Sequence, residues 1–302
     1  MRIVVIGAGA VGGYFAGRLA EAGEDVAVVA RGETLDVLQQ TGMTLIDVPH
    51  PPRRVTIPAY PSLAAAGDCD IVLVATKALD GTDAFAGLAG LSPGATVITL
   101  QNAVGAPHAA LELVGEPGRV WPGVVRGFLH HTGPGVVEFH GGPLSLTFGT
   151  WDGERSELAE EFARRLSAAG VAAVVHPDIW QDIWAKAMFV SSFSLLGALT
   201  GKPLGDMLAD ELLAHELRCL MAEVEAAARG AGVALPPDIV ADTMAFAAAM
   251  PPTSTSSLQR DLLAGAAAEL GAQIGAISKL ARSFDVPTPR FAFGYALLRA
   301  RR

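Results

Sequence analysis

One lysine in the C-terminal half, Lys186, has surroundings that could give it a chemical role. It lies within residues 179–190, a run so rich in Trp, Ile, Met and Phe that a helix there must be largely buried. An ammonium buried without partners is costly. Lys186 therefore either extends its charged end to the surface or faces a polar cleft, where it could act as a general acid. The sequence leaves both alternatives open.

A carboxylate nearer the C-terminus poses a similar question. Glu269 is nearly alone among Ala, Gly and Leu in residues 262–277, which we interpret as part of one helix over residues 258–284. A carboxylate on so apolar a helix requires a cation or a ligand. Ser256 and Ser257 come about three turns earlier, at the expected start of this helix. They either cap the helix or, with the free amides there, bind a ligand carboxylate.

The N-terminus carries a glycine motif directly after an apolar, β-branched strand at residues 3–6 and before a helix at residues 14–22. In the spacing G-x-G-x-x-G, the first glycine permits a tight turn, the second lets the backbone approach a pyrophosphate, and the third allows close packing of helix and strand. The amides and dipole at the helix start favour an anion. The sequence therefore predicts a dinucleotide-binding loop made of Gly7, Ala8, Gly9, Ala10, Val11 and Gly12.

The residue after the second strand indicates which dinucleotide binds. Residues 25–30 predict this strand, and Arg31 follows it. At this position an acid binds a ribose 2′-hydroxyl, whereas an Arg suits a 2′-phosphate. We therefore expect NADP(H) rather than NAD(H). The alternative is that Arg31 is an ordinary solvated loop charge.

Two further polar residues follow strands of the same region. Residues 70–76 and 95–100 predict buried strands, after which come Lys77 and Asn102. Ligands of open α/β sheets bind beyond the carboxyl ends of the strands, so we expect both side chains to lie beside the cofactor. Either could instead be an ordinary loop residue.

The elements around these residues predict an α/β protein. In residues 1–175 short apolar strands alternate with helical stretches, which indicates a parallel sheet with helices on both faces. Residues 119–149 predict antiparallel hairpins that complete this sheet. His130 and His131 lie there without an acidic or cysteine partner at a ligand spacing, so we expect surface or strand histidines. A helix over residues 157–169 and a strand over residues 171–175 end the region.

A domain boundary is expected after residue 176, because nearly every later segment has helical periodicity, including residues 179–199, 208–230 and 258–284. We predict an N-terminal Rossmann-type doubly wound sheet over residues 1–176, which binds NADP(H), and a C-terminal all-α domain over residues 177–302. The helical domain would bind substrate and could form a dimer interface.

Composition disfavours several classes of protein. The 302 residues are 51% hydrophobic and 18% charged, with a net charge of −9, which disfavours nucleic-acid and membrane-surface partners. Cys69 and Cys219 show neither metal-ligand spacing nor a disulfide framework, so we expect no metal and a reducing compartment. No uncharged run reaches the ~20 residues of a membrane span and the first strand leaves no room for a signal peptide, so we expect a cytoplasmic protein.

The ordered set of motifs resembles the 2-dehydropantoate 2-reductases, also called ketopantoate reductases, over the whole length of the chain. The resemblance is carried by Ile-Gly-Ala-Gly-Ala-Val-Gly-Gly at 6–13, Ala-Arg-Gly at 30–32, Thr-Lys-Ala at 76–78, Gln-Asn at 101–102, Trp-Ala-Lys at 184–186, Ser256 and Ser257 with Asp261 and Glu269, and Pro-Thr-Pro at 287–289.

The resemblance implies NADPH-dependent reduction of 2-dehydropantoate (ketopantoate) to (R)-pantoate, a step of pantothenate and coenzyme A biosynthesis, in a cleft between the domains. It implies that Lys186 donates the proton to the carbonyl oxygen, that Lys77 lies by the cofactor, and that Ser257 holds the substrate. Asn102 and Glu269 would each contact cofactor and substrate. A 2-oxo acid is then the partner, and a homodimer is possible.

Three positions depart from the family pattern in the substrate half. The family commonly has asparagines four and eight residues after the lysine, where this chain has Val190 and Ser194, and an acid two residues after the glutamate, where it has Gly271. Ser194 could still hydrogen-bond the substrate, whereas Val190 could not. A reductase of a different 2-oxo acid or carbonyl is therefore one alternative, and a non-catalytic NADP(H)-sensing protein is another.

Overall fold

The structure is a computed structural model that describes residues 1–80 and 82–301. The chain forms two compact units. Unit 1 consists of Met1–Lys77, Asp83–Gln101 and Ala106–Ile179, and unit 2 of Ala78–Thr82, Asn102–Gly105 and Trp180–Arg302. The loops that follow two strands of unit 1 therefore pack as part of unit 2.

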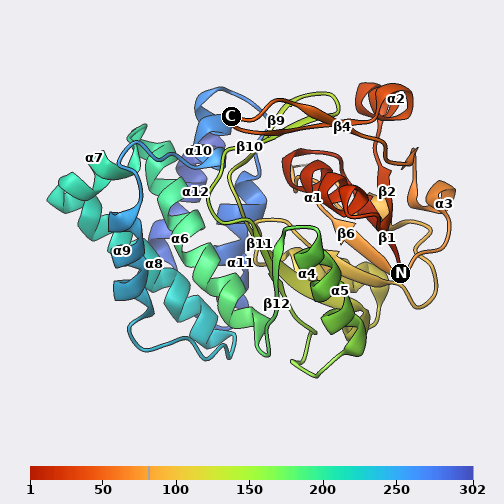
Figure 1. Ribbon diagram of the computed structural model, residues 1–302. Helices are drawn as coiled ribbons and strands as arrows, with labels where there is room; N and C mark the ends of the chain where they lie inside the picture. Colours follow the sequence, from red (N-terminus) through yellow and green to blue (C-terminus); the bar gives the residue numbers. More distant parts are fainter. Residues whose placement is uncertain (81, 302) are drawn as a thin grey trace. The chain divides into compact units, whose positions relative to one another are not determined.

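Unit 1 is built on an eight-stranded sheet in the order β12-β11-β8-β7-β6-β1-β2-β5. Figure 1 labels β1, β2, β6, β11 and β12 of this sheet. From β5 to β8 every neighbouring pair is parallel, and the chain order reverses between β1 and β6. This is the doubly wound order of dinucleotide-binding folds, and it confirms the predicted fold class. The strands are β1 (Arg2–Ile6), β2 (Asp25–Val29), β5 (Ala59–Tyr60), β6 (Ile71–Val74), β7 (Thr96–Thr99), β8 (Val120–Arg126), β11 (Ser145–Phe148) and β12 (Ala172–Val175).

The strands at the middle of this sheet are apolar and β-branched because both of their faces are covered. All residues of β6 and β7 are buried, as are the last four of β1. Such strands show no alternation of polar and apolar residues. The helical elements of unit 1 are α1 (Ala10–Glu21), α2 (Gly32–Thr41), α3 (Leu63–Ala66), η1 (Ala86–Leu88), α4 (Ala106–Val114), η2 (Pro117–Arg119) and α5 (Glu157–Ala168).

A second, four-stranded sheet in the order β4-β3-β10-β9 corrects part of the prediction for residues 119–149. Of the predicted hairpins, β8 and β11 join the main sheet, whereas β9 and β10 pair with each other and β10 lies parallel to β3. The strands β3 and β10 cover a face of α1, because Gly13 of this helix lies against Met43 and Val137. The strands are β3 (Met43–Asp47), β4 (Arg53–Val55), β9 (Leu129–Gly133) and β10 (Val136–Phe139).

Helix α1 packs between the two sheets on small residues. A Cβ at Gly12 would lie 2.0 Å from the Gly7 oxygen, and a Cβ at Gly17 would lie 2.7 Å from the Leu45 side chain of β3. Gly12 is therefore required for the close approach of helix and strand, as its place in the motif predicts.

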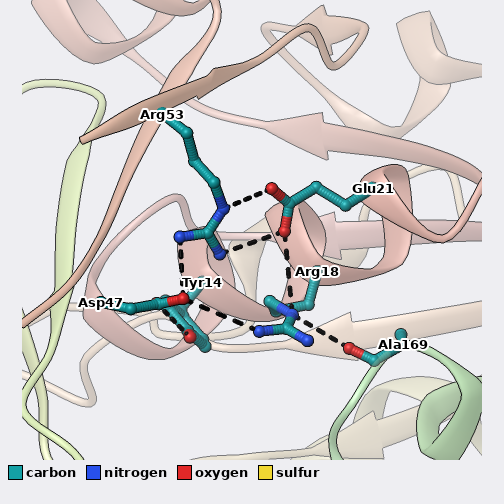
Figure 2. A network of polar contacts seen from close by, with 6 residues as sticks. All are labelled: Tyr14, Arg18, Glu21, Asp47, Arg53 and Ala169. Atoms are coloured by element: carbon teal, nitrogen blue, oxygen red, sulfur yellow. Dashed lines mark hydrogen bonds and ion pairs between the residues drawn. The ribbon is translucent and has the colours of Figure 1, made fainter. Parts of the chain in front are cut away.

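A network of polar contacts also holds α1 to the second sheet (Figure 2). The Tyr14 hydroxyl donates a hydrogen bond of 2.6 Å to Oδ1 of Asp47. Arg53 of β4 contacts Asp47 at 2.8 Å and donates to both carboxylate oxygens of Glu21, at 2.5 and 3.1 Å. The helix that begins at the glycine loop is thus fixed by side chains of β3 and β4.

Between residues 180 and 301, the described part of unit 2 consists of helices joined by turns and loops. Its longest helix, α6, packs against three later elements: the Ser191 hydroxyl donates to the Gln273 carbonyl, Gly197 lies against Gln259, and Leu195 lies against Gly294. The helices are α6 (Ile179–Thr200), α7 (Leu204–Ala209), α8 (Glu211–Gly230), α9 (Ile239–Ala249), α10 (Ser257–Leu263), the π-helix η3 (Gly271–Gly275), α11 (Ala276–Ser283) and α12 (Pro289–Ala300).

Among the described residues, α6 alone has the length and apolar composition that could cross a membrane. Asp182 and Lys186 lie within this helix, and 61% of its most apolar 18-residue stretch is buried inside the protein. Core helices of soluble proteins can have the same length and composition.

Two predicted helices are interrupted. The segment over residues 208–230 is divided at Asp210, whose side chain caps α8 by accepting from the amides of Leu212 and Leu213. The predicted helix over residues 258–284 was wrong, because Gly265, at φ 66, ends α10. The amide of Ala266 bonds to the Asp261 carbonyl and that of Gly265 to the Leu262 carbonyl, which is a complete Schellman motif.

Candidate functional site

The glycine loop of unit 1 has the geometry of an anion-binding turn. Gly7 has a φ of 98, and Gly9, the N-cap of α1, borders open space, since a Cβ there would meet nothing within 4 Å. No side chain caps α1 and no acid lies in its first turn. The amides of Ala10, Val11 and Gly12 have no acceptor within the helix, so this end attracts an anion.

Arg31 follows β2 and is the N-cap of α2. Its backbone is extended and its side chain is exposed. The guanidinium is therefore free to adjust to a phosphate, and the acid nearest in sequence, Glu33, lies within α2 rather than at the end of the strand.

Lys186 and Asn102 form a pair within unit 2. Helix α6 carries Lys186, whose Nζ donates a hydrogen bond of 2.5 Å to Oδ1 of Asn102, which lies three residues after the end of β7. Lys186 is half-buried and Asn102 is exposed, so the ammonium is held in place while it remains accessible. A positioned, accessible ammonium can stabilise a developing oxyanion and protonate it.

Glu269 is held by two donors from other parts of unit 2. Its Oε1 accepts a 2.8 Å hydrogen bond from the amide of Ala78, directly after Lys77, and its Oε2 accepts one of 3.2 Å from Nε2 of Gln273. A second hydrogen bond joins the same two segments with donor and acceptor exchanged: the amide of Gly271 donates to Oδ1 of Asp80 at 2.8 Å. Two hydrogen bonds thus join residues 78–80 to residues 269–271. Glu269 itself precedes η3 in a non-helical stretch instead of lying inside a helix.

The remaining predicted residues differ in their accessibility. Ser256 is the N-cap of α10 and accepts from the amide of Gln259 at 3.0 Å, so the capping alternative holds for it, whereas Ser257 is exposed. Ser194 is completely buried, and its hydroxyl has no hydrogen-bond partner in the described part of the chain. Val190 is half-buried one turn after Lys186.

The other candidate residues belong to unit 1. Lys77 is exposed at the end of a stretch of unit 1. His130 and His131 are exposed on β9, as expected of strand histidines. Over residues 1–80 and 82–301 there is no group of three His, Cys, Asp or Glu that could hold a metal ion.

Sequence reasoning missed Asp80, Ser191 and Gln273. Gln273 had a detectable signal, since it stands four residues after Glu269, a spacing at which helical side chains meet. Asp80 and Ser191 had no such signal, because each bonds to a residue far away in the sequence. The separation is 191 positions for Asp80 and 82 positions for Ser191.

Comparison with known proteins gives the family. The sequence model described as "Ketopantoate reductase PanE/ApbA" matches residues 3–153, and the one described as "Ketopantoate reductase PanE/ApbA C terminal" matches residues 178–302. The chain belongs to the ketopantoate reductase family. Members of this family are oxidoreductases that act on a CH–OH group, and this chain is one of them.

The relatives that follow match along nearly their whole length. The 2-dehydropantoate 2-reductase of Mesorhizobium japonicum is 32% identical and is aligned over 99% of this chain and 97% of its own. The crystal structure of a PanE/ApbA family ketopantoate reductase from Ralstonia eutropha is 29% identical, with a TM-score of 0.88, over 99% of this chain and 98% of that one. A D-mandelate dehydrogenase with NADH and anilino(oxo)acetate has the same TM-score at 20% identity, over 99% and 98%, which shows a shared fold alone.

Proposed function

We propose that this ketopantoate reductase family member reduces ketopantoate to (R)-pantoate with NADPH, as a step of pantothenate and coenzyme A biosynthesis in the cytoplasm. The observation that carries the proposal is the 2.5 Å hydrogen bond between Lys186 and Asn102. It holds an ammonium accessible beside an amide that can bind polar groups of a ligand. The full-length relative of Mesorhizobium japonicum, named 2-dehydropantoate 2-reductase, supports the choice of substrate.

In this proposal Lys186 is the general acid. Reduction of a 2-oxo group turns the carbonyl oxygen into an alkoxide, which needs a positive charge beside it and then a proton. Nζ of Lys186 supplies both. Asn102 keeps Nζ in position, Ser257 binds the substrate, and the Glu269 carboxylate contacts the ligands. The nicotinamide dinucleotide supplies the hydride when bound.

The residues of unit 1 fit this cofactor. The space beside Gly9, which a Cβ would fill, suits a pyrophosphate against the free amides of α1. The loop lies where the strand order reverses, between β1 and β6, which is where open α/β sheets bind their ligands. Exposed Arg31 would hold the 2′-phosphate, and Lys77 after β6 would lie by the cofactor.

Substitution of the lysine tests the mechanism. Lys186→Ala should lower turnover by about a hundredfold or more, the usual contribution of a general acid, and leave NADPH binding nearly unchanged. Turnover is followed by loss of nicotinamide absorbance and binding by fluorescence titration. The matched control is Lys279→Ala, which removes an exposed lysine of α11. Equal turnover of the two variants would remove Lys186 from the mechanism.

A second candidate is the reduction of a different 2-oxo acid. Val190 offers no hydrogen bond one turn after Lys186, and the Ser194 hydroxyl is completely buried. The polar contacts that the family pattern places at these two positions are therefore reduced, which favours a more apolar substrate. The D-mandelate dehydrogenase, whose structure contains anilino(oxo)acetate, has the same fold with such a ligand.

A further inference from the structure

Gln273 is a buried residue that contacts Glu269 twice. It lies in η3 with 2% of its surface exposed. Its Nε2 donates to Oε2 of Glu269 at 3.2 Å, and its backbone amide donates to the Glu269 carbonyl at 2.9 Å. Its Oε1 has no hydrogen-bond partner among the described residues. The amide therefore turns its donor to the carboxylate even though its own acceptor is left unpaired.

Gln273 is itself fixed to the helix that carries Lys186. The hydroxyl of Ser191, five residues after Lys186 on α6, donates to the Gln273 carbonyl at 2.9 Å, and this contact is buried. A buried hydrogen bond resists competition from water. The position of η3 is therefore set by α6.

The start of η3 is held by a further hydrogen bond. Oδ1 of Asp80 accepts from the Gly271 amide, and a Cβ at Gly271 would lie 2.7 Å from that oxygen. Any side chain at residue 271 would displace Asp80. The carboxylate of Glu269 is thus oriented by Gln273 on one oxygen and by the Ala78 amide on the other.

We propose that Gln273 is a positioning residue of the reductase: it orients the Glu269 carboxylate and links it, through Ser191, to the helix of Lys186. The proposal rests on the proposed function, in which Glu269 contacts the ligands. Gln273 acts through Glu269 and need not touch substrate or cofactor.

Two substitutions test this. Gln273→Met keeps a long unbranched side chain and removes the donor, so kcat/KM should fall about ten- to hundredfold, the equivalent of one hydrogen bond to a charged group. Gln273→Glu places a second carboxylate against Glu269. Two carboxylates so close share one proton, and one pKa of the pair rises.

The glutamate variant therefore gives a pH signature. Below the raised pKa, one of the two carboxyl groups is protonated and can donate a hydrogen bond to the other. The ratio of the variant's kcat/KM to that of the natural protein should therefore approach 1. Above the raised pKa both groups are ionised and repel, and the ratio should fall by at least the loss in Gln273→Met. The matched control is Thr288→Val, which removes a buried 3.0 Å hydrogen bond to Ser278 elsewhere in unit 2.

A readout without turnover separates this proposal from the proposed function. Amide hydrogen exchange of residues 76–80 should quicken in Gln273→Met and not in Thr288→Val, because the Ala78 amide loses an oriented acceptor. Unchanged exchange together with a pH-independent loss equal to that of Thr288→Val would overturn the positioning role. Quickened exchange in a protein that reduces no 2-oxo acid would leave the positioning of Glu269 standing and refute the proposed function instead.

Discussion

Lys186 and Asn102 come from segments 84 positions apart, and a hydrogen bond joins their side chains. An amide oxygen accepts a hydrogen bond without cancelling charge. Asn102 therefore orients the ammonium without placing a negative charge beside it. A carboxylate as this partner would weaken the field that a developing alkoxide experiences.

The choice between NADPH and NADH depends on Arg31 in this account. Arg31→Ala should weaken the binding of NADPH by about ten- to hundredfold, as expected for a hydrogen-bonded charge pair, and leave the binding of NADH nearly unchanged. The dissociation constants are measured by fluorescence titration of the two cofactors. Arg54→Ala, which removes another exposed arginine of unit 1, is the control. Equal weakening of both cofactors by Arg31→Ala would remove Arg31 from the phosphate site.

The residue types of the site could be predicted from the sequence better than their pairing. Lys186 and Glu269 stand out because each is a charge in an apolar run, and Asn102 because it follows a buried strand. The bond from Lys186 to Asn102 and that from Ala78 to Glu269 depend on how distant segments pack. Periodicity contains no information on such packing.

At the scale of elements, α1 connects the glycine loop to the rest of unit 1 through its contacts with both sheets. Tyr14 is completely buried, and burial together with its hydrogen bond to Asp47 raises its pKa above the ordinary value. The neutral phenol is thus the form that the fold stabilises. The anchoring of α1 should depend on that proton.

Tyr14→Phe should therefore lower the free energy of unfolding by about 1.5–3 kcal/mol at neutral pH, the range for a hydrogen bond to a charged group. Because the folded-state pKa is raised, this contribution is complete below about pH 10, the unfolded value, and is lost as pH rises through the folded value. Denaturant unfolding at neutral and strongly alkaline pH measures the difference between the two proteins. A difference that stays constant across this range would contradict the role of the phenol proton.

The break after α10 depends on Gly265. Gly265→Ala should cost about 1 kcal/mol, because a side chain at φ 66 is strained although nothing lies within 4 Å of its Cβ. Gly118→Ala is the matched control, since Gly118 has equal space and no positive φ. Denaturant unfolding compares the two. Equal effects would mean that the left-handed conformation at Gly265 carries no cost.

Elements with a strong apolar signal were predicted, and those set by a single residue or by a distant partner were not. The buried strands β1, β6 and β7 and the long helix α6 agree with their sequence patterns. The stop at Gly265 was missed because glycines are frequent in that apolar run, and the second sheet because β3 and β10 lie about 90 residues apart in the chain.

In the whole molecule, the residues of the proposed function come from both units. The glycine loop and Arg31 belong to unit 1, and Lys186, Asn102 and Glu269 to unit 2. The domain limits at residues 176 and 177 stay a prediction. The homodimer also stays a prediction, and light scattering would measure the oligomeric state. Fold class followed from the alternation of strands and helices, whereas substrate choice depends on side chains such as Val190 that the overall fold does not determine.

The most direct test of the central claim is NADPH oxidation by the purified protein with ketopantoate beside a small panel of other 2-oxo acids, followed by loss of nicotinamide absorbance. We expect ketopantoate to be turned over efficiently and with the highest kcat/KM of the panel. A better substrate elsewhere in the panel would contradict the assignment of ketopantoate and favour the second candidate. Tight NADPH binding with no turnover of any 2-oxo acid would contradict the proposed reaction itself.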